Sequence, residues 1–281
     1  MATRRFLNLE RRLDKQPELK QQYCDFIDEY ERLGHLRVVE IDKTEKPGSV
    51  FYLPHHCILK PTSTTTKLRV VFDDALEIGP VVQRDLVSIL VNFRGFRYVF
   101  TVDVPMMFRQ IGVLRADRKY QLFLYRKQRD ELLTVRELQT VTYGLTSSPF
   151  QATMVLNQIA EDYQKDFPEA ARAIKKGADI LAGADSVPEV CKLQQDVNYI
   201  LAKGCFGVHK WCSNAEEIMN CIPEELRGVT FEVIGDNSNA VVKTLGVVWN
   251  PRKDWFSYCV TEGDPGASTR RKILSEVAKI F

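Results

Sequence analysis

A single carboxylate, Asp103, directly follows a run of apolar residues, and its type and position suit it to chemistry. Residues 98–102 are β-branched or aromatic and predict a buried strand. A charge at the end of such a strand needs a partner, so Asp103 caps a turn, pairs with a base or holds a metal ion. Taken alone, the local sequence favours a cap or an ion pair over a metal site.

Two cations lie two residues apart at the start of another predicted strand, residues 68–72. Lys67 and Arg69 project from one face of that strand because side chains alternate along it. They are either solvated charges at the edge of a sheet or a pair that binds phosphate. An arginine suits the second role because its guanidinium can donate two parallel hydrogen bonds to phosphate oxygens.

Six blocks of sequence occur in one order and together resemble the reverse transcriptase region of BEL/Pao-type long-terminal-repeat retrotransposon polyproteins. The resemblance covers nearly the whole chain. The blocks are residues 52–56, 60–73, 98–111, 141–150, 210–214 and 243–251.

The resemblance implies an α+β fold of the polymerase right-hand type, with fingers and a palm whose antiparallel sheet is backed by two helices. Residues 1–97 would form an N-terminal helix and the fingers, and residues 98–214 the palm with interleaved fingers strands. Residues 215–281 would form a palm-to-thumb or connection region truncated at the C-terminus. The implied activity is RNA-directed DNA synthesis by two-metal nucleotidyl transfer, with Mg²⁺ or Mn²⁺ as cofactor.

The implied catalytic residues are Asp103 and Asp179, and the implied metal ligands are Asp103, Val104 and Asp179. Mg²⁺ transfer chemistry needs carboxylates from separate strands to converge on two ions about 3.5 to 4 Å apart. Asp103 and Asp179 come from separate predicted strands, and their carboxylates are therefore expected to lie close enough to share a cation.

Further residues are assigned to the nucleotide by the same resemblance. Lys67 and Arg69 would grip its triphosphate. Phe108 would be the gate beneath its sugar, with an ordinary core phenylalanine as the alternative interpretation. Gly144 matches a position where the backbone must approach template or nucleotide closely, which glycine permits.

The chain departs from the family at the second catalytic strand. Residues 183–186, Gly-Ala-Asp-Ser, set a register that lays the family's Tyr-x-Asp-Asp on residues 176–179. Ala178 then replaces the first aspartate and Lys176 the tyrosine, so one ligand is lost and a cation opposes Mg²⁺. Losing about 4 kcal/mol of transition-state stabilisation would slow the reaction about a thousandfold. Asp185 is a poor substitute because it precedes a predicted helix and suits its dipole.

A second departure follows Asp73. Only residues 74–78 separate it from Gly79-Pro80, where the family has a longer loop and a helix. Shortened fingers would close less well over a nucleotide. We therefore expect weak or no polymerase activity, and a catalytically inactive nucleic-acid-binding or scaffolding remnant is the alternative. An unrelated structural domain would require the ordered blocks to be a coincidence.

Bulk composition limits the class of protein. The 281 residues are 44% hydrophobic and can bury one large or two small cores. A net charge of +2 means that primer-template and nucleotide must be bound by local clusters of cations. The expected cluster is Lys60, Lys67, Arg69, Arg94, Arg97 and Arg109.

Seven cysteines without a CxxC pair are expected to be reduced and mostly buried. No run of 18 apolar residues and no secretory leader occurs, so we expect no membrane partner. The expected location is intracellular: the cytoplasm, a virus-like particle or the nucleus. Residues 274–281 begin an amphipathic pattern without a stop signal, which suggests a fragment of a longer protein.

Periodicity and turn residues predict the elements that position these side chains. Helices are expected at residues 17–33, at 85–93 as a short buried helix, from Ser148 as N-cap, and after a capping box that begins at Ser186. Strands are expected at residues 36–41, 110–114, 120–125, 132–141, 206–211, 241–248 and 255–260. His55 and His56 are predicted to be surface or hydrogen-bonded histidines rather than metal ligands.

Overall fold

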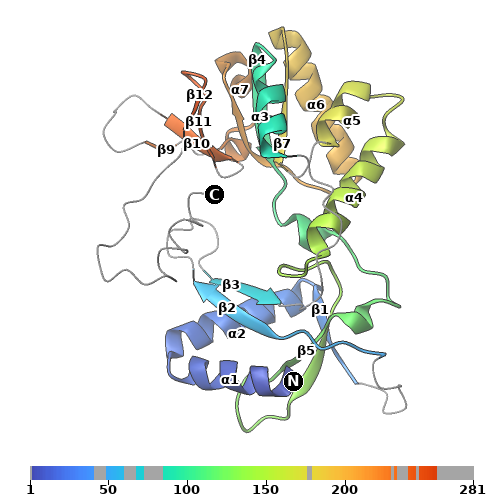
Figure 1. Cartoon of the computed structure of the whole chain (residues 1–281), viewed down its shortest axis with the longest axis vertical. Helices are drawn as coiled ribbons and strands as arrows, with labels where there is room; N and C mark the ends of the chain where they lie inside the picture. The colour runs from blue at the N-terminus through green and yellow to red at the C-terminus, as the bar shows by residue number, and fades with distance from the viewer. Residues whose placement is uncertain are drawn as a thin grey trace. The chain divides into compact units, whose positions relative to one another are not determined.

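The computed structural model describes residues 2–40, 49–59, 68–72, 85–175, 179–228, 231–232, 240–244 and 247–257 (Figure 1). Helices alternate with antiparallel sheets, which confirms the α+β class. The chain forms two compact units, the first made of residues 1–82 and 106–155 and the second of residues 83–105 and 156–281. The predicted three-part division at residues 97 and 214 stays a prediction.

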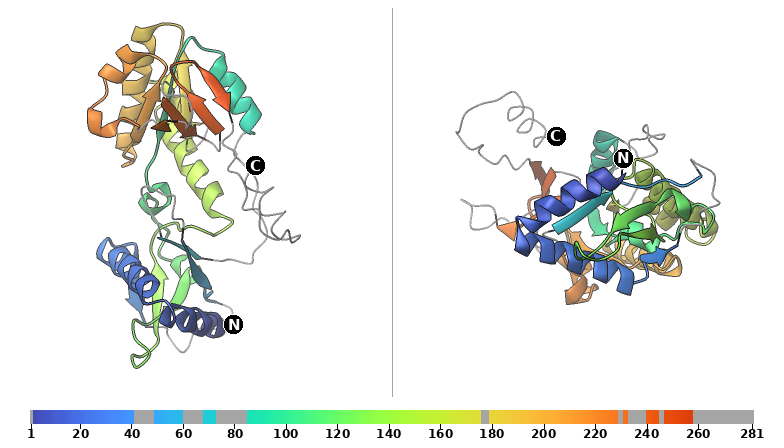
Figure 2. Two further views of the ribbon diagram at one scale, coloured as in Figure 1. Left: turned by 90° about the vertical axis from the view of Figure 1, so that its left-hand side faces the viewer. Right: turned by 90° about the horizontal axis from the view of Figure 1, so that it is seen from below.

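The described part of the first unit contains two helices, the start of α4 (Ser148–Asp162) and two small sheets (Figures 1 and 2). The helices are α1 (Ala2–Asp14) and α2 (Pro17–Arg32), with the short turns η1 (Met107–Gln110) and η2 (Arg118–Tyr120). One sheet has the order β1-β6-β5, from Leu36–Val39, Thr134–Leu138 and Leu122–Tyr125. The other pairs β2 (His55–Leu59) with β3 (Leu68–Phe72).

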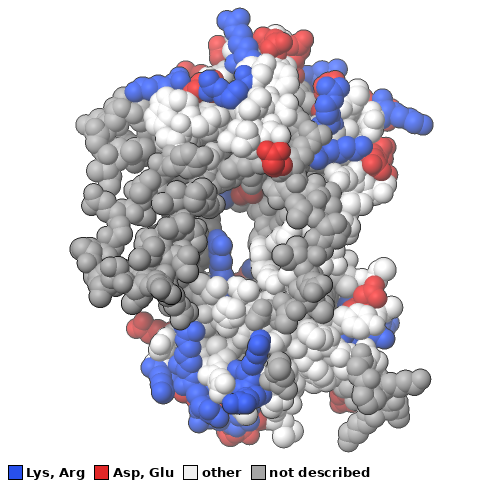
Figure 3. All heavy atoms as spheres, in the orientation of Figure 1, with Lys and Arg blue, Asp and Glu red and all other residues white. Residues whose placement is uncertain are grey.

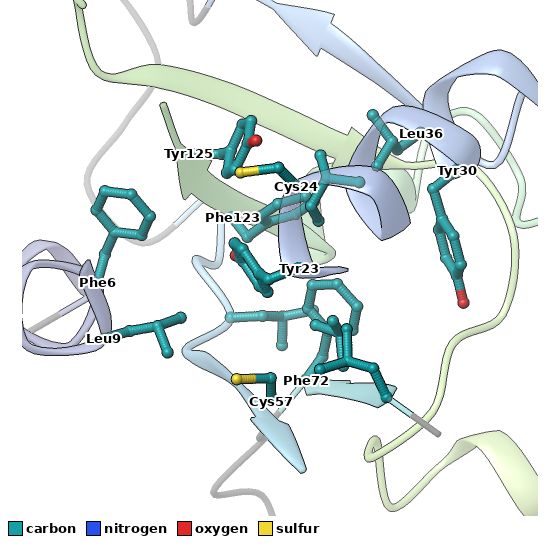
Figure 4. Packing of buried hydrophobic residues seen from close by; sticks show 14 of the residues in the cluster. Phe6, Leu9, Tyr23, Cys24, Tyr30, Leu36, Cys57, Phe72, Phe123 and Tyr125 are labelled. Carbon is teal, nitrogen blue, oxygen red and sulfur yellow. The ribbon is translucent and has the colours of Figure 1, made fainter. Parts of the chain in front are cut away.

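The core of the first unit forms around α2. Pro17 occupies the start of this helix, where its missing N–H costs nothing, and Gly34 after its end is left-handed with φ +75°. Both predicted boundaries are thus confirmed. Residues at helical spacing bury one face of α2: Leu19, Tyr23, Cys24, Ile27 and Tyr30. Figure 4 shows Tyr23 beside Phe72 and Phe123, whose rings meet edge to face at 5.1 Å.

His55 is buried in this core and is 6% exposed. Its Nε2 lies 2.5 Å from the Tyr23 hydroxyl, and its ring packs against Phe72 and Phe123. The prediction of a hydrogen-bonded histidine is therefore confirmed. Burial lowers the pKa of His55 to about 4, although a hydrogen bond with the Leu53 backbone opposes the shift. His55 is a neutral structural residue at pH 7.

The second unit is centred on β4 (Tyr98–Asp103), which lies between β7 (Asp179–Ala184) and β8 (His209–Ser213). A second sheet has the order β12-β11-β10-β9, from Trp255–Ser257, Val247–Asn250, Ala240–Thr244 and Phe231–Glu232. The helices are α3 (Leu86–Arg94), α5 (Pro168–Ile174), α6 (Val187–Lys203) and α7 (Glu216–Asn220), with the short turn η3 (Glu224–Leu226). Helix α4 (Ser148–Asp162) begins in the first unit and ends in the second.

Both faces of the β4 sheet are covered, which explains the run of β-branched and aromatic residues before Asp103. On one face, Val99 and Leu181 pack against Phe93 of α3 and Trp249 of β11. Helix α6 packs on β4 and β7 from the other side of the sheet (Figure 2). The Ser186 hydroxyl caps α6 by accepting from the Glu189 amide, as the capping box predicted.

Several predicted elements are wrong. Residues 110–114 form no strand, because only Gly112 makes an isolated bridge to Thr140. Residues 241–248 contain parts of two antiparallel strands, β10 and β11, rather than one. Ser148 does not act as the N-cap of α4, since its hydroxyl donates to the Thr142 carbonyl. Helix α1 was not predicted.

Helix α3 is amphipathic rather than buried. Val87 and Val91 are 69% and 66% exposed, whereas Ile89 and Phe93 are buried. The six cysteines in the described ranges are free thiols, and Cys24, Cys57 and Cys212 are buried. Cys259 and the amphipathic pattern at residues 274–281 lie outside the described residues. Within the described ranges, no helix has the length and apolar character needed to cross a membrane.

The buried histidine predicts a pH dependence of stability. The unfolded chain protonates His55 near its ordinary pKa of 6.5, but the folded chain does so only near 4. Falling pH therefore favours unfolding across this window, by about 3 kcal/mol in total at about 1.36 kcal/mol per pH unit. In urea titrations between pH 7 and 4, His55→Gln should lose less stability than the parent.

The matched control is His56→Gln, because His56 is exposed in the same strand. All three tryptophans belong to the second unit, so unfolding of the first unit should be followed by far-ultraviolet circular dichroism and the tyrosine signal. If the parent and His55→Gln lose stability in parallel as the pH falls, His55 is not the titrating group.

Candidate active site

Asp103 ends the central strand of the second unit, as the sequence predicted. Strand β4 keeps a regular register with β7, in which Asp103 is the partner of Asp179. Because side chains alternate along a strand, Asp103 shares the face of Val99 and Thr101. Val99 packs toward α3, so Asp103 lies on the face opposite α6. Its carboxylate is part-buried, with the side chain 38% exposed.

Two basic side chains of β8 converge on one oxygen of this carboxylate. His209 Nε2 lies 3.1 Å and Lys210 Nζ 3.0 Å from Asp103 Oδ2. The three side chains are 32%, 50% and 38% exposed for His209, Lys210 and Asp103. Solvent at this level of exposure screens the pairing, so it holds the carboxylate in place more than it stabilises the fold.

An unusual backbone brings these two neighbours to one carboxylate. Consecutive residues of a regular strand point to opposite faces. Here Lys210 is left-handed with φ +56°, and the register of β4 with β8 shifts between Thr101 and Asp103. A non-glycine residue in this conformation costs about 1 to 3 kcal/mol, and such strain gathers at functional sites. The bulge thus aims a histidine and a lysine at the same atom.

The structure describes the backbone of Asp179 but not its side chain. It is the first residue of β7, and its α-carbon is the cross-strand partner of the Asp103 α-carbon. The Asp179 side chain and residues Lys176 and Ala178 lie outside what the structure describes. Val104 follows Asp103 and is buried, with 5% exposure.

The described side chains do not by themselves complete a metal site. Among them, no group of three histidine, cysteine, aspartate or glutamate residues is placed to hold a metal ion. One carboxylate that already contacts Lys210 does not suffice for Mg²⁺, which prefers several oxygen ligands and no neighbouring cation. The predicted metal ligand Asp179 has its side chain outside the described residues, so the metal site stays a prediction.

The residues predicted to bind nucleotide lie in the first unit. Arg69 is exposed on β3, opposite Ile58 of β2, whereas Lys67 lies outside the described residues. Phe108 is part-buried, and its ring meets that of Tyr143 edge to face at 5.0 Å. The carbonyl of Tyr143 accepts a hydrogen bond from the Phe72 amide at 3.1 Å. Phe108 is thus tied to the end of the strand that carries Arg69.

Gly144 makes the closest backbone approach in this group. Its φ is +97°, and a Cβ there would lie 2.1 Å from the Phe72 carbonyl oxygen and 2.6 Å from Val71 Cγ1. The sequence predicted a glycine that permits close approach, and the structure supplies a partner for it within the chain, the end of β3.

Some of the predicted nucleic-acid cations are already engaged. Arg109 stacks on Tyr30 at 4.4 Å, lies 3.9 Å from Glu29, and has a side chain only 12% exposed. Burial raises the pKa of Tyr30 to about 12, although the Arg109 charge opposes the shift. Arg94 pairs with Asp254 at 3.2 Å. These two arginines serve packing and pairing within their units.

The remaining members of the predicted cluster differ in what they contact. Arg69 and Arg97 are exposed, and Arg97 lies 5.3 Å from the ring centre of Tyr98. Lys60 lies outside the described residues, as Lys67 does.

Sequence reasoning missed the basic pair at Asp103. Lys210 begins one of the six blocks, and His209 precedes it, so the signal present was a basic dipeptide near the end of the strand predicted at residues 206–211. Nothing in the sequence marks Lys210 as left-handed, because that conformation follows from the bulge opposite Asp103.

The close approach at Gly144 predicts that it cannot be replaced. Gly144→Ala should lower the free energy of unfolding of the first unit by about 3 kcal/mol or more, since strain and a clash with the Phe72 carbonyl combine. Gly112→Ala is the control, because a methyl group at that position would have no atom within 4 Å, and it should change stability by less than about 0.5 kcal/mol. Equal stability of the two variants in urea would refute this packing.

Comparison with known proteins leaves the family open. The resemblance to reverse transcriptases rests on the six ordered blocks and on the residues that match the family within them. No protein-family model and no curated protein sequence matches the chain.

Proposed function

We propose that this chain is the reverse transcriptase domain of a BEL/Pao-type retrotransposon polyprotein, impaired in catalysis. The observation that carries the proposal is the placement of Asp103. It ends the central strand of an antiparallel sheet, has Asp179 as its cross-strand partner, and lies on the face opposite α6. This arrangement suits a polymerase palm, which needs carboxylates from two strands at one edge of a helix-backed sheet.

In this proposal Asp103 and Asp179 are the catalytic carboxylates, and Val104 lies next to the metal. Two bound Mg²⁺ or Mn²⁺ ions would supply the positive charge that stabilises the transferring phosphoryl group. Arg69 and Lys67 would orient the triphosphate, and Phe108 and Gly144 would shape the place of the nucleotide. These roles fit an exposed Arg69 and a part-buried Phe108 beside Tyr143.

Two features of the chain argue for weak activity. Ala178 stands where the family has a carboxylate, and Lys176 adds a cation two residues before it in the sequence. In addition, Lys210 and His209 already contact Asp103 Oδ2, so a metal ion must compete with an ammonium group 3.0 Å away. The missing carboxylate lowers the affinity for Mg²⁺ because a ligand is lost. The lysine ammonium groups lower it because like charges repel at short distance.

A second candidate is a nucleic-acid-binding or scaffolding domain without chemistry. The contact of Lys210 with Asp103 favours it, because the ammonium group neutralises the carboxylate without a metal. Primer extension and nucleic-acid binding distinguish the two candidates, since only the first predicts recovery of synthesis when the missing ligand is restored.

Both candidates predict salt-dependent binding of a primer-template duplex. Lys67→Gln with Arg69→Gln should weaken binding and reduce the slope of log affinity against log salt by about 1.8, at about 0.9 for each phosphate that is no longer neutralised. Fluorescence anisotropy at salt concentrations from about 50 to about 200 mM measures this slope. Arg37→Gln serves as a control, because Arg37 is paired with Glu137 at 2.8 Å. Binding that is insensitive to salt would count against both candidates.

Restoring the palm residues should restore synthesis in part. The parent chain is expected to extend a primer on a homopolymer RNA template negligibly, with either Mg²⁺ or Mn²⁺. Ala178→Asp with Lys176→Tyr should recover a measurable part of the roughly thousandfold loss, because a ligand returns and a repelling charge leaves. Recovery should stay partial because the segment after Asp73 is short.

Asp103→Asn in the restored chain is the control and should abolish extension. Robust extension by the parent would show that the register placing Ala178 is wrong. A restored chain that binds duplex without extending it would place the defect in the nucleotide-binding residues instead.

A further inference from the structure

An open pocket of about 290 Å³ lies between α1 and β2 in the first unit, and none of the proposed catalytic or nucleotide-binding residues lines it. Its size is near the lower end of small-ligand pockets, about 300 Å³. The lining residues are Arg5, Asn8, Leu9, Arg12, Pro54, His55 and His56. None of them is acidic, and two carry permanent positive charge.

Helical spacing explains why these groups share one surface. Arg5, Asn8 and Arg12 are separated by three and four residues, so they project from the same face of α1. Leu9, on the same stripe, is buried and anchors the helix in the core. In Figure 3, Lys and Arg atoms gather over the region where Figure 1 places α1.

The acidic residues of α1 are paired outside the pocket. Glu10 is buried and accepts two hydrogen bonds from Arg126, at 2.8 and 2.9 Å. Asp14 pairs with Lys20 at 3.0 Å and with Arg129 at 2.7 Å. Both carboxylates of the helix are therefore satisfied by cations from outside the pocket.

Arg5, Arg12 and the Asn8 amide supply hydrogen-bond donors to the pocket. The Asn8 side-chain oxygen accepts from Arg11 at 3.2 Å, which leaves the amide NH₂ to face a ligand. The charge of Arg12 acts on Cys57 in β2: burial raises the pKa of this thiol, and Arg12 opposes the shift. Arg12 thus lies close enough to β2 to reach a ligand in the pocket.

We propose that this pocket binds the phosphate backbone of a single-stranded nucleic acid. Arg5 and Arg12 would contact phosphates, Asn8 would donate to a phosphate oxygen, and the His56 ring beside Pro54 would pack on a base or sugar. The choice of a nucleic acid as the source of phosphate rests on the proposed function.

The spacing of the arginines favours a polymer over a single free phosphate. Seven residues separate Arg5 from Arg12, about 10.5 Å along the helix axis at 1.5 Å per residue. One phosphate ion is too small to bridge two guanidinium groups set this far apart along the helix. Two phosphates of one flexible strand can each contact one of the arginines, whereas one inorganic phosphate would engage fully with only one of them.

Matched double variants of the full chain test the proposal. Arg5→Gln with Arg12→Gln removes two charges that line the pocket, and Arg4→Gln with Lys15→Gln removes two exposed charges that do not line it. The probe is a labelled oligo(dT) of about 20 nucleotides, followed by anisotropy over the same salt range. The pocket variant should bind about tenfold more weakly, with a salt slope lower by about 1.4 at about 0.7 per phosphate. The control should change the slope by less than half as much.

Equal losses in the two double variants, or no loss in either, would overturn the pocket. An independent readout is the His56 ring and Asn8 amide signals in NMR spectra of the parent, titrated with oligo(dT) and with inorganic phosphate. Shifts with oligo(dT) support the proposal. Shifts with inorganic phosphate alone would overturn the nucleic-acid part, and no shift with either probe would overturn the site.

Primer extension separates this proposal from the proposed function. If the restored chain fails to extend a primer while oligo(dT) still moves the His56 and Asn8 signals, the pocket stands and the polymerase assignment fails. If extension recovers while those signals stay fixed, the polymerase assignment stands and the pocket fails.

Discussion

The central position of β4 constrains the second unit more than any other feature. This strand donates and accepts hydrogen bonds on both edges and is covered on both faces, so every residue from Val99 to Val102 must be apolar or internally paired. A charged residue can be placed only at the end of this strand. Asp103 occupies that point, where the carboxylate can reach partners from β8 without a charge being placed in the core.

The partners of Asp103 show how the same position can serve two kinds of chemistry. An aspartate at a strand end can take either a metal ion or a basic side chain, because both satisfy its charge. Here the left-handed Lys210 and the bulge beside it supply two basic groups, at 3.0 and 3.1 Å. The sheet therefore contains one residue with a strained backbone, Lys210, and the two basic groups hold the carboxylate in place.

Local signals in the sequence predicted the elements that are bounded by strong turn residues. Pro17 and Gly34 bracket α2, residues 68–72 match β3, and the capping serine at 186 begins α6.

The errors in the predicted strands occur where long-range pairing decides the structure. Residues 110–114 look like a strand but find only one bridge partner. The missed helix α1 is a different case, because Phe6, Leu9 and Leu13 follow helical spacing and the signal was present in the sequence. The same distinction applies to the candidate site. The sequence predicts Asp103 as a charged residue at the end of a buried strand. The contact of His209 and Lys210 with it depends on a register shift between two strands, which the sequence does not show. The stacking of Arg109 on Tyr30 has no local signature either, because it joins two segments far apart in the sequence.

Binding and catalysis differ in how much they lose when one residue changes. Transfer chemistry requires several carboxylates at one point, so one missing ligand, as at Ala178, affects every step that depends on the metal. Phosphate binding uses separate contacts that contribute about additively to the salt dependence, so a chain can lose one and keep most of its affinity. Under the proposed function, the first unit would then retain its phosphate contacts at Arg69, Arg5 and Arg12 after synthesis is lost. A decaying polymerase is expected to become a nucleic-acid-binding protein before it loses its fold, because its fold depends on buried strands such as β4 and not on the completeness of the metal site.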